Sequence, residues 1–354
     1  MIFGVICEFN PFHDGHKYLI DSIKGKDDYV LCAMSGSFVQ RGECAVYSKF
    51  DRAETAVKNG ADIVFELVSP CSTLSAQGFA QAGVELLEST GVCDALAFGA
   101  ECDDIDELTR IANEIKDKDE LIKEELKSGC SYPAARKKVI DSPVLDEPNN
   151  ILALEYISST KLKPVAVKRI GKGHDSDDKM YSASEIRKTL SDKATMKACE
   201  SAVLYKLRTM SADDFKRLDD VSEGLENRIC EAVKTAKSLD ELYDAVKTKR
   251  YTHSRIRRII LRAFLDINKD EPKRPQYLRI LALSERGRDL LPEIKKHAAL
   301  PVITKYSEVK ECSDTVKTQF EKESIITDIH ALCFTPPRDC NEDKTKKLFI
   351  HKSY

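Results

Sequence analysis

The chain has 354 residues, of which 42% are hydrophobic and 32% are charged, and its formal net charge is −3. This composition is typical of a globular protein of roughly two domains, and the nearly neutral charge means that any surface for nucleic acid must be local. Twelve scattered cysteines without a C-x-x-C pair, no secretory leader and no apolar run of membrane-spanning length argue against a disulfide scaffold or a membrane protein. We therefore expect reduced thiols and a cytoplasmic location.

Apolar runs alternate with helical periodicity in the first part of the chain. Runs with β-branched members predict buried strands at residues 2–7, 28–34, 63–67, 95–98 and 163–170. Helical spacing lies between the first four, at about 18–23, 49–58 and 77–87. This alternation is typical of a parallel, doubly wound sheet.

The pattern changes after about residue 195. Strand patterns nearly vanish and helical periodicity dominates as far as residue 298, before an apolar run at 300–304 that is a candidate for a return to a sheet. We therefore predict an α/β fold, with a Rossmann-like, parallel-sheet domain over residues 1–195 and a mostly helical domain over 196–354.

The most informative stretch follows the first predicted strand. An Asn10-Pro11 turn leads into the tetrad His13-Asp14-Gly15-His16, and a helix comes next. The loop between the first strand and the first helix of an open α/β sheet binds phosphates, because unpaired amides at the helix start favour an anion. Gly15 lets the backbone approach a ligand, and both histidines can face one anion. Histidines near a turn are often plain surface residues, but this order of strand, turn and helix favours a phosphate site.

A second set of phosphate-binding residues is predicted near residue 185. Ser182, Ser184, Arg187 and Lys188 stand at the start of another predicted helix, with Ser184 a candidate N-cap. Hydroxyls and amides at a helix start, followed by an arginine one turn later, suit the β and γ phosphates of a nucleotide. Asp175, Asp177 and Asp178 just before it lack the pattern of a calcium loop, so no resident metal site is predicted.

These residues carry a resemblance to a known family. H-x-G-H followed by S-x-S-x-x-R resembles the signatures of the nucleotidyltransferase superfamily that includes class I aminoacyl-tRNA synthetases. Over nearly the whole chain the sequence is similar to the bacterial tRNA(Met) cytidine acetate ligase family. The segments that carry this likeness are residues 8–16, 35–43, 98–101, 148–152, 168–171 and 251–255. One departure is Ser184 followed by Glu185, where the superfamily often has a threonine.

The resemblance implies a Rossmann-like nucleotidyltransferase domain and a two-step reaction. Acetate attacks the α-phosphate of ATP, which gives acetyl-adenylate and pyrophosphate. The N4 amine of the wobble cytidine of elongator tRNA(Met) then takes the acetyl group, forming N4-acetylcytidine. ATP is a substrate, Mg²⁺ is expected with it, and an oligomeric state is not indicated.

The resemblance also implies which residues take part. His13, His16 and Arg187 would be catalytic. ATP would be held by Ile6, Cys7, Glu8, Phe9, Asn10, Pro11, Phe12, His13, Asp14, Gly15, His16, Lys17, Tyr18, Leu19, Gly99, Asn150, Arg169, Ile170, Ser182 and Ser184. The loop Gln40-Arg41-Gly42-Glu43, with Lys49 and Arg52, would either close over acetate and the acyl-adenylate or form an ordinary solvated loop and helix face.

A basic segment in the second half is the candidate surface for tRNA. Residues 247–262 contain seven Lys or Arg and no acid. Helical spacing puts Arg255, Arg258 and Arg262 on one face, opposite an isoleucine-rich face, and Lys249 and Arg250 precede them. A basic stripe of this kind suits docking on a phosphate backbone, and the alternative is a solvated helix face.

Two other functions remain compatible with these residues. One is an adenylyltransferase that joins ATP to a small phosphorylated metabolite through the same histidine loop. The other is a non-catalytic protein that binds RNA or a nucleotide and retains the fold.

Overall fold

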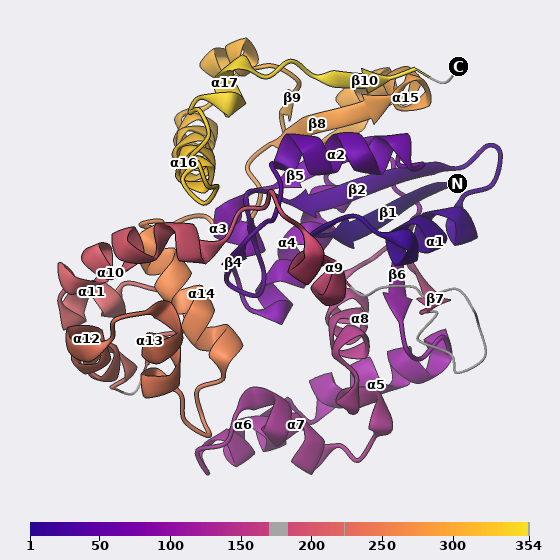
Figure 1. The fold of residues 1–354 in the computed structure, drawn as a ribbon. Coiled ribbons are helices and arrows are strands. Elements are labelled where there is room, and N and C mark those ends of the chain that lie inside the picture. Colours follow the sequence, from indigo (N-terminus) through magenta and orange to yellow (C-terminus); the bar gives the residue numbers. More distant parts are fainter. Residues whose placement is uncertain (170–182, 223, 353–354) are drawn as a thin grey trace.

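A computed structural model describes residues 1–169, 183–222 and 224–352 of the chain, without the side chain of Ser184 (Figure 1). Its main sheet has the strand order β10-β8-β5-β2-β1-β6-β7, with β9 beside β8. These strands are β1 (Ile2–Cys7), β2 (Tyr29–Ser35), β5 (Ile63–Leu67), β6 (Ala95–Ala100), β7 (Lys163–Lys168), β8 (Leu278–Ser284), β9 (Val302–Ile303) and β10 (Phe349–His351). The five strands from β5 to β7 run parallel, which confirms the predicted α/β class.

Helices cover both faces of this sheet. As a result, every residue from Val30 to Ser35 and from Ile63 to Leu67 is buried. One face packs on α1 (Asp14–Ile23) and α2 (Lys49–Lys58), through Ile20, Ile23 and Phe50 among others. The opposite face carries α3 (Ser69–Ser72), α4 (Ala76–Glu88), α5 (Ile105–Asp117), α8 (Pro148–Ser159) and α15 (Glu285–His297). Beyond α5 lie α6 (Asp119–Leu126) and α7 (Tyr132–Val139).

A helical unit follows the sheet half and has a core of its own. It comprises α10 (Glu200–Arg208), α11 (Ala212–Lys216), α12 (Leu225–Thr235), α13 (Leu239–Val246) and α14 (His253–Phe264), and α9 (Ala183–Thr189) precedes it. A small hairpin, β3 (Phe38–Val39) and β4 (Glu43–Cys44), inserts Phe38 and Cys44 into that core. The helical unit is therefore anchored on the loop that follows β2.

The predicted mostly helical second half needs a correction. After α14 the chain returns to the sheet: β8 pairs antiparallel with β5, and β9 and β10 lie parallel beside β8. The prediction missed β8 because its seven residues, which include Arg279, are all buried, and a mostly apolar segment without alternation does not distinguish a strand from a helix. The candidate strand at 300–304 is confirmed as β9.

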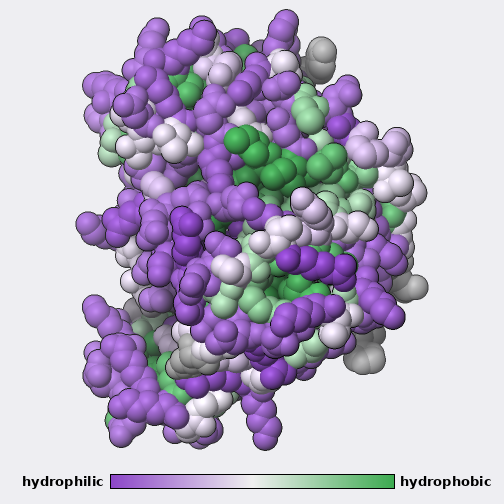
Figure 2. Space-filling view, turned by 90° about the vertical axis from the view of Figure 1, so that its left-hand side faces the viewer, coloured by the Kyte–Doolittle hydropathy of each residue, from purple (hydrophilic) through white to green (hydrophobic). Residues whose placement is uncertain are grey.

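The last helices, α16 (Asp314–Ala331) and α17 (Glu342–Thr345), pack against this returning part of the chain. The face shown in Figure 2 is largely hydrophilic, and its largest group of apolar residues lies in the upper half of the view. On α16 and its C-cap, Ile325 and Leu332 are exposed large apolar side chains. Within the described residues, no helix is both long and apolar enough to cross a bilayer.

Candidate active site

The site lies where the strand order reverses. Strands β2 and β6 lie on opposite sides of β1, and open α/β sheets bind ligands at such a switch point, beyond the carboxyl ends of the strands. A cavity of about 350 Å³ opens there. The predicted ATP and catalytic residues that line it are Ile6, Cys7, Glu8, Phe9, Asn10, His13, Gly15, His16, Tyr18, Leu19, Gly99, Arg169 and Arg187.

His13 and His16 hold each other in one arrangement. Their rings stack with centroids 3.8 Å apart. Nδ1 of His13 accepts a hydrogen bond from Gly15 N at 3.1 Å, and Nδ1 of His16 accepts one from His13 N at 3.3 Å. An imidazole that accepts at Nδ1 carries its proton at Nε2 when it is neutral. Both rings therefore have an Nε2–H donor left for a ligand.

Burial shifts the protonation of both histidines in the same direction. Desolvation lowers the pKa of His13 and, more strongly, that of His16, and the Arg169 guanidinium adds to both shifts. The two rings are thus neutral donors at neutral pH. Helix α1 begins at the same point, so its first amides add a partial positive charge without any ionised group.

The backbone of this loop is tightly constrained. Phe9, which is buried, has φ of 44°, in the left-handed region that non-glycine residues rarely occupy. A Cβ on Gly15 would lie 2.9 Å from Cε1 of His13. Glycine is thus needed at position 15 so that the His13 ring can fold back onto the helix start. This reason differs from the predicted one, which was close approach of the backbone to a ligand.

Arg187 connects α9 to the histidine loop. Its Nη1 donates to the carbonyl oxygen of Asn10 at 2.7 Å. The side chain of Asn10 is itself buried and accepts from Val46 N at 2.8 Å. The arginine predicted one turn into the second helix is thus brought beside the first loop, across 177 residues of sequence.

A polar wall faces the histidines from the end of β6. Oε1 of Glu101 accepts from Asn149 Nδ2 at 2.5 Å, and Arg169 Nη1 donates to Asn149 Oδ1 at 3.5 Å. Oδ1 of Asn150 accepts from the backbone amides of residues 101 and 102. Asn149 lines the cavity, whereas the buried Asn150 acts from behind to fix the loop after β6.

The apolar wall of the cavity, which was not predicted from the sequence, consists of Phe79, Phe98, Leu152 and Tyr156. Asn149, Leu152 and Tyr156 are spaced by three and four residues, so they share one face of α8. That spacing was visible in the sequence, but an apolar helix face predicts a core contact as readily as a cavity wall.

Several predicted residues lie elsewhere. Ile170, Ser182 and the loop with Asp175, Asp177 and Asp178 lie outside the described residues, as does the side chain of Ser184. Helix α9 begins at Ala183, so Ser184 is inside its first turn and is not its N-cap. Pro11, Phe12, Asp14 and Lys17 do not line the cavity, and Lys17 pairs with Asp21 on the surface of α1.

The loop of residues 40–43, with Lys49 and Arg52, was expected either to close over acetate and the acyl-adenylate or to form an ordinary solvated loop and helix face. Neither alternative holds in full. Gln40, Arg41 and Glu43 line the cavity, as the first alternative expects. Lys49 and Arg52, however, form neither a lid nor a solvated face, because both are buried. Arg52 donates to the main-chain oxygens of Glu8, Ser35 and Gly36, and Lys49 pairs with buried carboxylates.

The predicted basic stripe also needs a correction. Arg258 and Arg262 are buried, and they form ion pairs with Asp220 and Asp219 at 3.1 and 2.6 Å. Arg255 donates to the carbonyl oxygen of Asp220 at 2.6 Å. Helix α14 is thus packed on nearly all sides, and its arginines hold the turn after α11. Of the predicted tRNA residues, Lys249 is exposed and Arg250 is partly exposed.

Comparison with known proteins agrees with this geometry. The model of the HIGH Nucleotidyl Transferase family matches residues 1–203 and 191–346. The tRNA(Met) cytidine acetate ligase of Thermoanaerobacter sp. (strain X514) is 38% identical, over 94% of this chain and 95% of its own length. That of Acetivibrio thermocellus is 32% identical over 99% of both. The crystal structure of Thermotoga maritima TmcAL bound with alpha-thio ATP superimposes with a TM-score of 0.90, at 31% identity over 99% of this chain and 100% of that one.

Proposed function

Because the chain belongs to the tRNA(Met) cytidine acetate ligase family, we propose that it uses ATP to join acetate to the N4 amine of the wobble cytidine of elongator tRNA(Met). Acetate attacks the α-phosphate, pyrophosphate leaves, and the acetyl group of the resulting acetyl-adenylate passes to the cytidine. The adenylyltransferase alternative has less support, because the relatives named above are ligases.

The observation that carries the proposal is the pair of Nε2–H donors at the start of α1. His13, His16 and the first amides of the helix converge on one cavity, and Arg187 approaches it from α9. Displacement at a phosphate needs position and charge stabilisation more than covalent help. Donors that are fixed by their own backbone contacts stabilise the charge that grows on the leaving pyrophosphate, and they need little reorganisation to do so.

Mg²⁺ fits this site as a companion of the nucleotide. Glu43, one of the described residues that line the cavity, carries a carboxylate, and this carboxylate pairs with Arg257 at 2.6 Å. Mg²⁺ is commonly bound through substrate phosphates and water with one or two carboxylates. We propose that it enters with ATP and neutralises charge on the phosphates.

The apolar wall supports a small acyl substrate. Phe79, Phe98 and Tyr156 bound one side of the cavity, and the side chains of Gln40 and Arg41 lie at the same cavity. A methyl group is accommodated against the aromatic rings while the carboxylate faces polar groups. We propose that the acetate lies against this wall.

The twelve cysteines, all among the described residues, are free thiols, which supports a reducing cytoplasm as the place of the reaction.

The test separates the three candidate functions. Purified protein is incubated with ATP, [14C]acetate and tRNA(Met), and acetate-dependent exchange of labelled pyrophosphate into ATP is measured in parallel. Label in tRNA that requires ATP supports the ligase. Pyrophosphate release with a phosphorylated metabolite and no label in tRNA would indicate the adenylyltransferase instead. ATP binding without any turnover would leave a binding protein.

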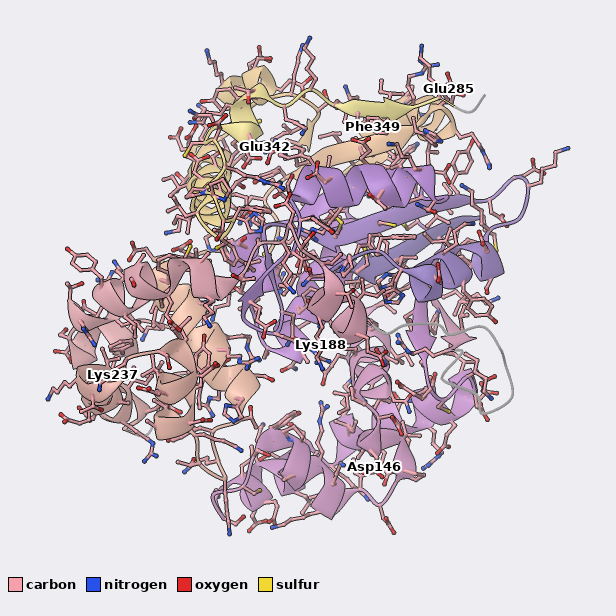
Figure 3. All side chains as sticks on the ribbon, viewed as in Figure 1. Asp146, Lys188, Lys237, Glu285, Glu342 and Phe349 are labelled. Carbon is pink, nitrogen blue, oxygen red and sulfur yellow. The ribbon has the colours of Figure 1, made fainter. Side chains whose placement is uncertain are left out.

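The tRNA surface is proposed at the mouth of the cavity and on the segment before α14. Lys168 lines the cavity and is 66% exposed. Figure 3 shows Lys188 on α9 near the middle of the molecule, beside the Arg187 that reaches into the site. Lys188 and Lys249 are both exposed. A single strand of tRNA that delivers its cytidine to this cavity would pass close to Lys168 and Lys188.

Replacing Lys249 by alanine is expected to weaken tRNA binding about two- to tenfold and to reduce the salt slope of log K by about 1, because one phosphate contact is lost. Affinity is measured by filter binding between 50 and 200 mM salt. The control is Lys234→Ala, an exposed lysine of α12 that pairs with Glu231. Equal affinity and slope in wild type and Lys249→Ala would exclude this residue from the tRNA surface.

A further inference from the structure

One carboxyl group in the cavity, that of Glu8, has been named so far only among the residues expected to hold ATP, and no proton transfer has been assigned to it. Glu8 directly follows β1, and its Oε1 accepts from the backbone amide of Gln40 at 2.8 Å. Among the described residues, no donor forms a hydrogen bond with Oε2 of Glu8, although the side chain lines the same cavity as His13, His16 and Arg187. One oxygen is therefore fixed and the other is available to a ligand.

The surroundings of Glu8 make it a stronger base than an ordinary glutamate. Burial raises the pKa of Glu8, although the Gln40 amide and the nearby charges of Arg41, Arg52 and Arg187 oppose the shift. Tyr156 and Cys7 also interact with Glu8, and both are neutral at neutral pH, since burial raises their pKa values still further above 7. Arg52 donates hydrogen bonds to main-chain oxygens, and Arg187 donates one to the main-chain oxygen of Asn10.

The second half-reaction requires a proton acceptor, whereas the first does not. When N4 of cytidine attacks the carbonyl carbon of acetyl-adenylate, a C–N bond forms and the bond from that carbon to the AMP oxygen breaks. The electron pair leaves with the AMP phosphate, and the nitrogen must lose a proton. Both histidines use Nδ1 as an acceptor for a backbone amide, and Glu43 is paired with Arg257.

Resting on the function proposed above, we propose that the carboxylate of Glu8 accepts the proton from the N4 amine in the transfer step. The amide of Gln40 holds Oε1, and Oε2 is left to act as the acceptor in the cavity that Glu8 lines. Acetate activation then depends on the histidines and the helix start, and acetyl transfer depends additionally on Glu8. The proton later passes to solvent when AMP and the modified tRNA leave.

The experiment measures the two half-reactions separately in Glu8→Gln. This variant keeps an oxygen for the Gln40 amide and removes the base. Acetate-dependent ATP–pyrophosphate exchange is expected to persist, with any loss of ATP affinity appearing in KM, whereas single-turnover transfer from preformed acetyl-adenylate to tRNA is expected to fall about 100-fold or more relative to exchange. Retained exchange also shows that the variant is folded. The matched control is Glu88→Gln. The carboxylate of Glu88 accepts a hydrogen bond from the Lys161 amide at 2.7 Å, and Glu88 does not line the cavity.

The pH profile gives a second readout. The ionised form is the base, so transfer by wild type should fall as the pH drops through the raised pKa of Glu8, and this acid limb should be absent in Glu8→Gln. Equal loss of exchange and transfer in Glu8→Gln, or an unchanged transfer rate, would overturn the proposal. Failure of the proposed function itself would look different, because wild type would then show no acetate-dependent exchange.

Discussion

Replacement of His16 by alanine is expected to lower kcat/KM for acetate-dependent ATP–pyrophosphate exchange by about 10²–10³-fold, the usual effect of removing one preorganised donor from a developing charge. The ring is held by its own Nδ1 contact and by stacking on His13, so its Nε2–H is aimed before substrate arrives. The change also removes label transfer from [14C]acetate to tRNA. Exchange is measured at saturating and at low ATP, so that the loss in kcat is separated from the loss in ATP affinity.

Two further variants make the His16 result specific. His16→Asn places an oxygen near the position of Nδ1 and removes Nε2, so it should keep the contact with His13 N and still lose most of the activity. His297→Ala removes an exposed histidine that pairs with Glu293 on α15, and it should behave as wild type. Near-wild-type exchange in His16→Asn would mean that the ring only caps the helix.

The strand-loop-helix order at the N-terminus was predictable because each part has its own local pattern. Residues 2–7 form a continuous apolar run, Asn10 and Pro11 are turn formers, and the next helix has its apolar residues at helical spacing. Local patterns also located β2, β5 and β6. Strand β8 was not predictable in this way, because its partner β5 lies more than 200 residues earlier and no alternation marks it as a strand.

The buried cations were the main failure of the sequence analysis. A run of arginines in an amphipathic pattern predicts a solvated stripe, yet Arg258 and Arg262 meet Asp219 and Asp220 about 40 residues earlier in the chain. Nothing local distinguishes an exposed arginine from one whose partner is distant in sequence. The same limit applies to Glu8: only the fold shows that Gln40 holds one of its oxygens.

Lys49 is the strongest case of a charge that local sequence places on the surface. Its ammonium group, fully buried, contacts the carboxylates of Glu66 and Asp343, the second at 2.9 Å. Arg279 on β8 reaches Asp343 at 2.6 Å, and Glu323 on α16 lies 3.9 Å from Lys49. The cluster joins α2, β5, β8, α16 and α17, so it fixes the returning C-terminal segments against the sheet half.

The protonation of this cluster keeps its charges balanced. Burial and the neighbouring Glu66 raise the pKa of Glu323 to about 8, so this carboxyl is mostly neutral at pH 7. Glu323 accepts from the amide of Ser69 at 2.6 Å. Two cations, Lys49 and Arg279, then face the two carboxylates of Glu66 and Asp343. Removal of one cation leaves a buried negative charge without compensation.

Lys49→Met is therefore expected to lower the free energy of unfolding by about 3–5 kcal/mol, the usual cost of breaking a buried pair from one side. Urea denaturation followed by circular dichroism measures it at pH 7. The control on the same helix is Lys58→Met, whose exposed pair with Glu54 should contribute about 0–1 kcal/mol. The double variant Lys49→Met with Glu66→Gln should recover part of the loss, because it restores the charge balance. A loss below about 1 kcal/mol in Lys49→Met, equal to that in Lys58→Met, would show that the cluster contributes specificity of packing and little stability.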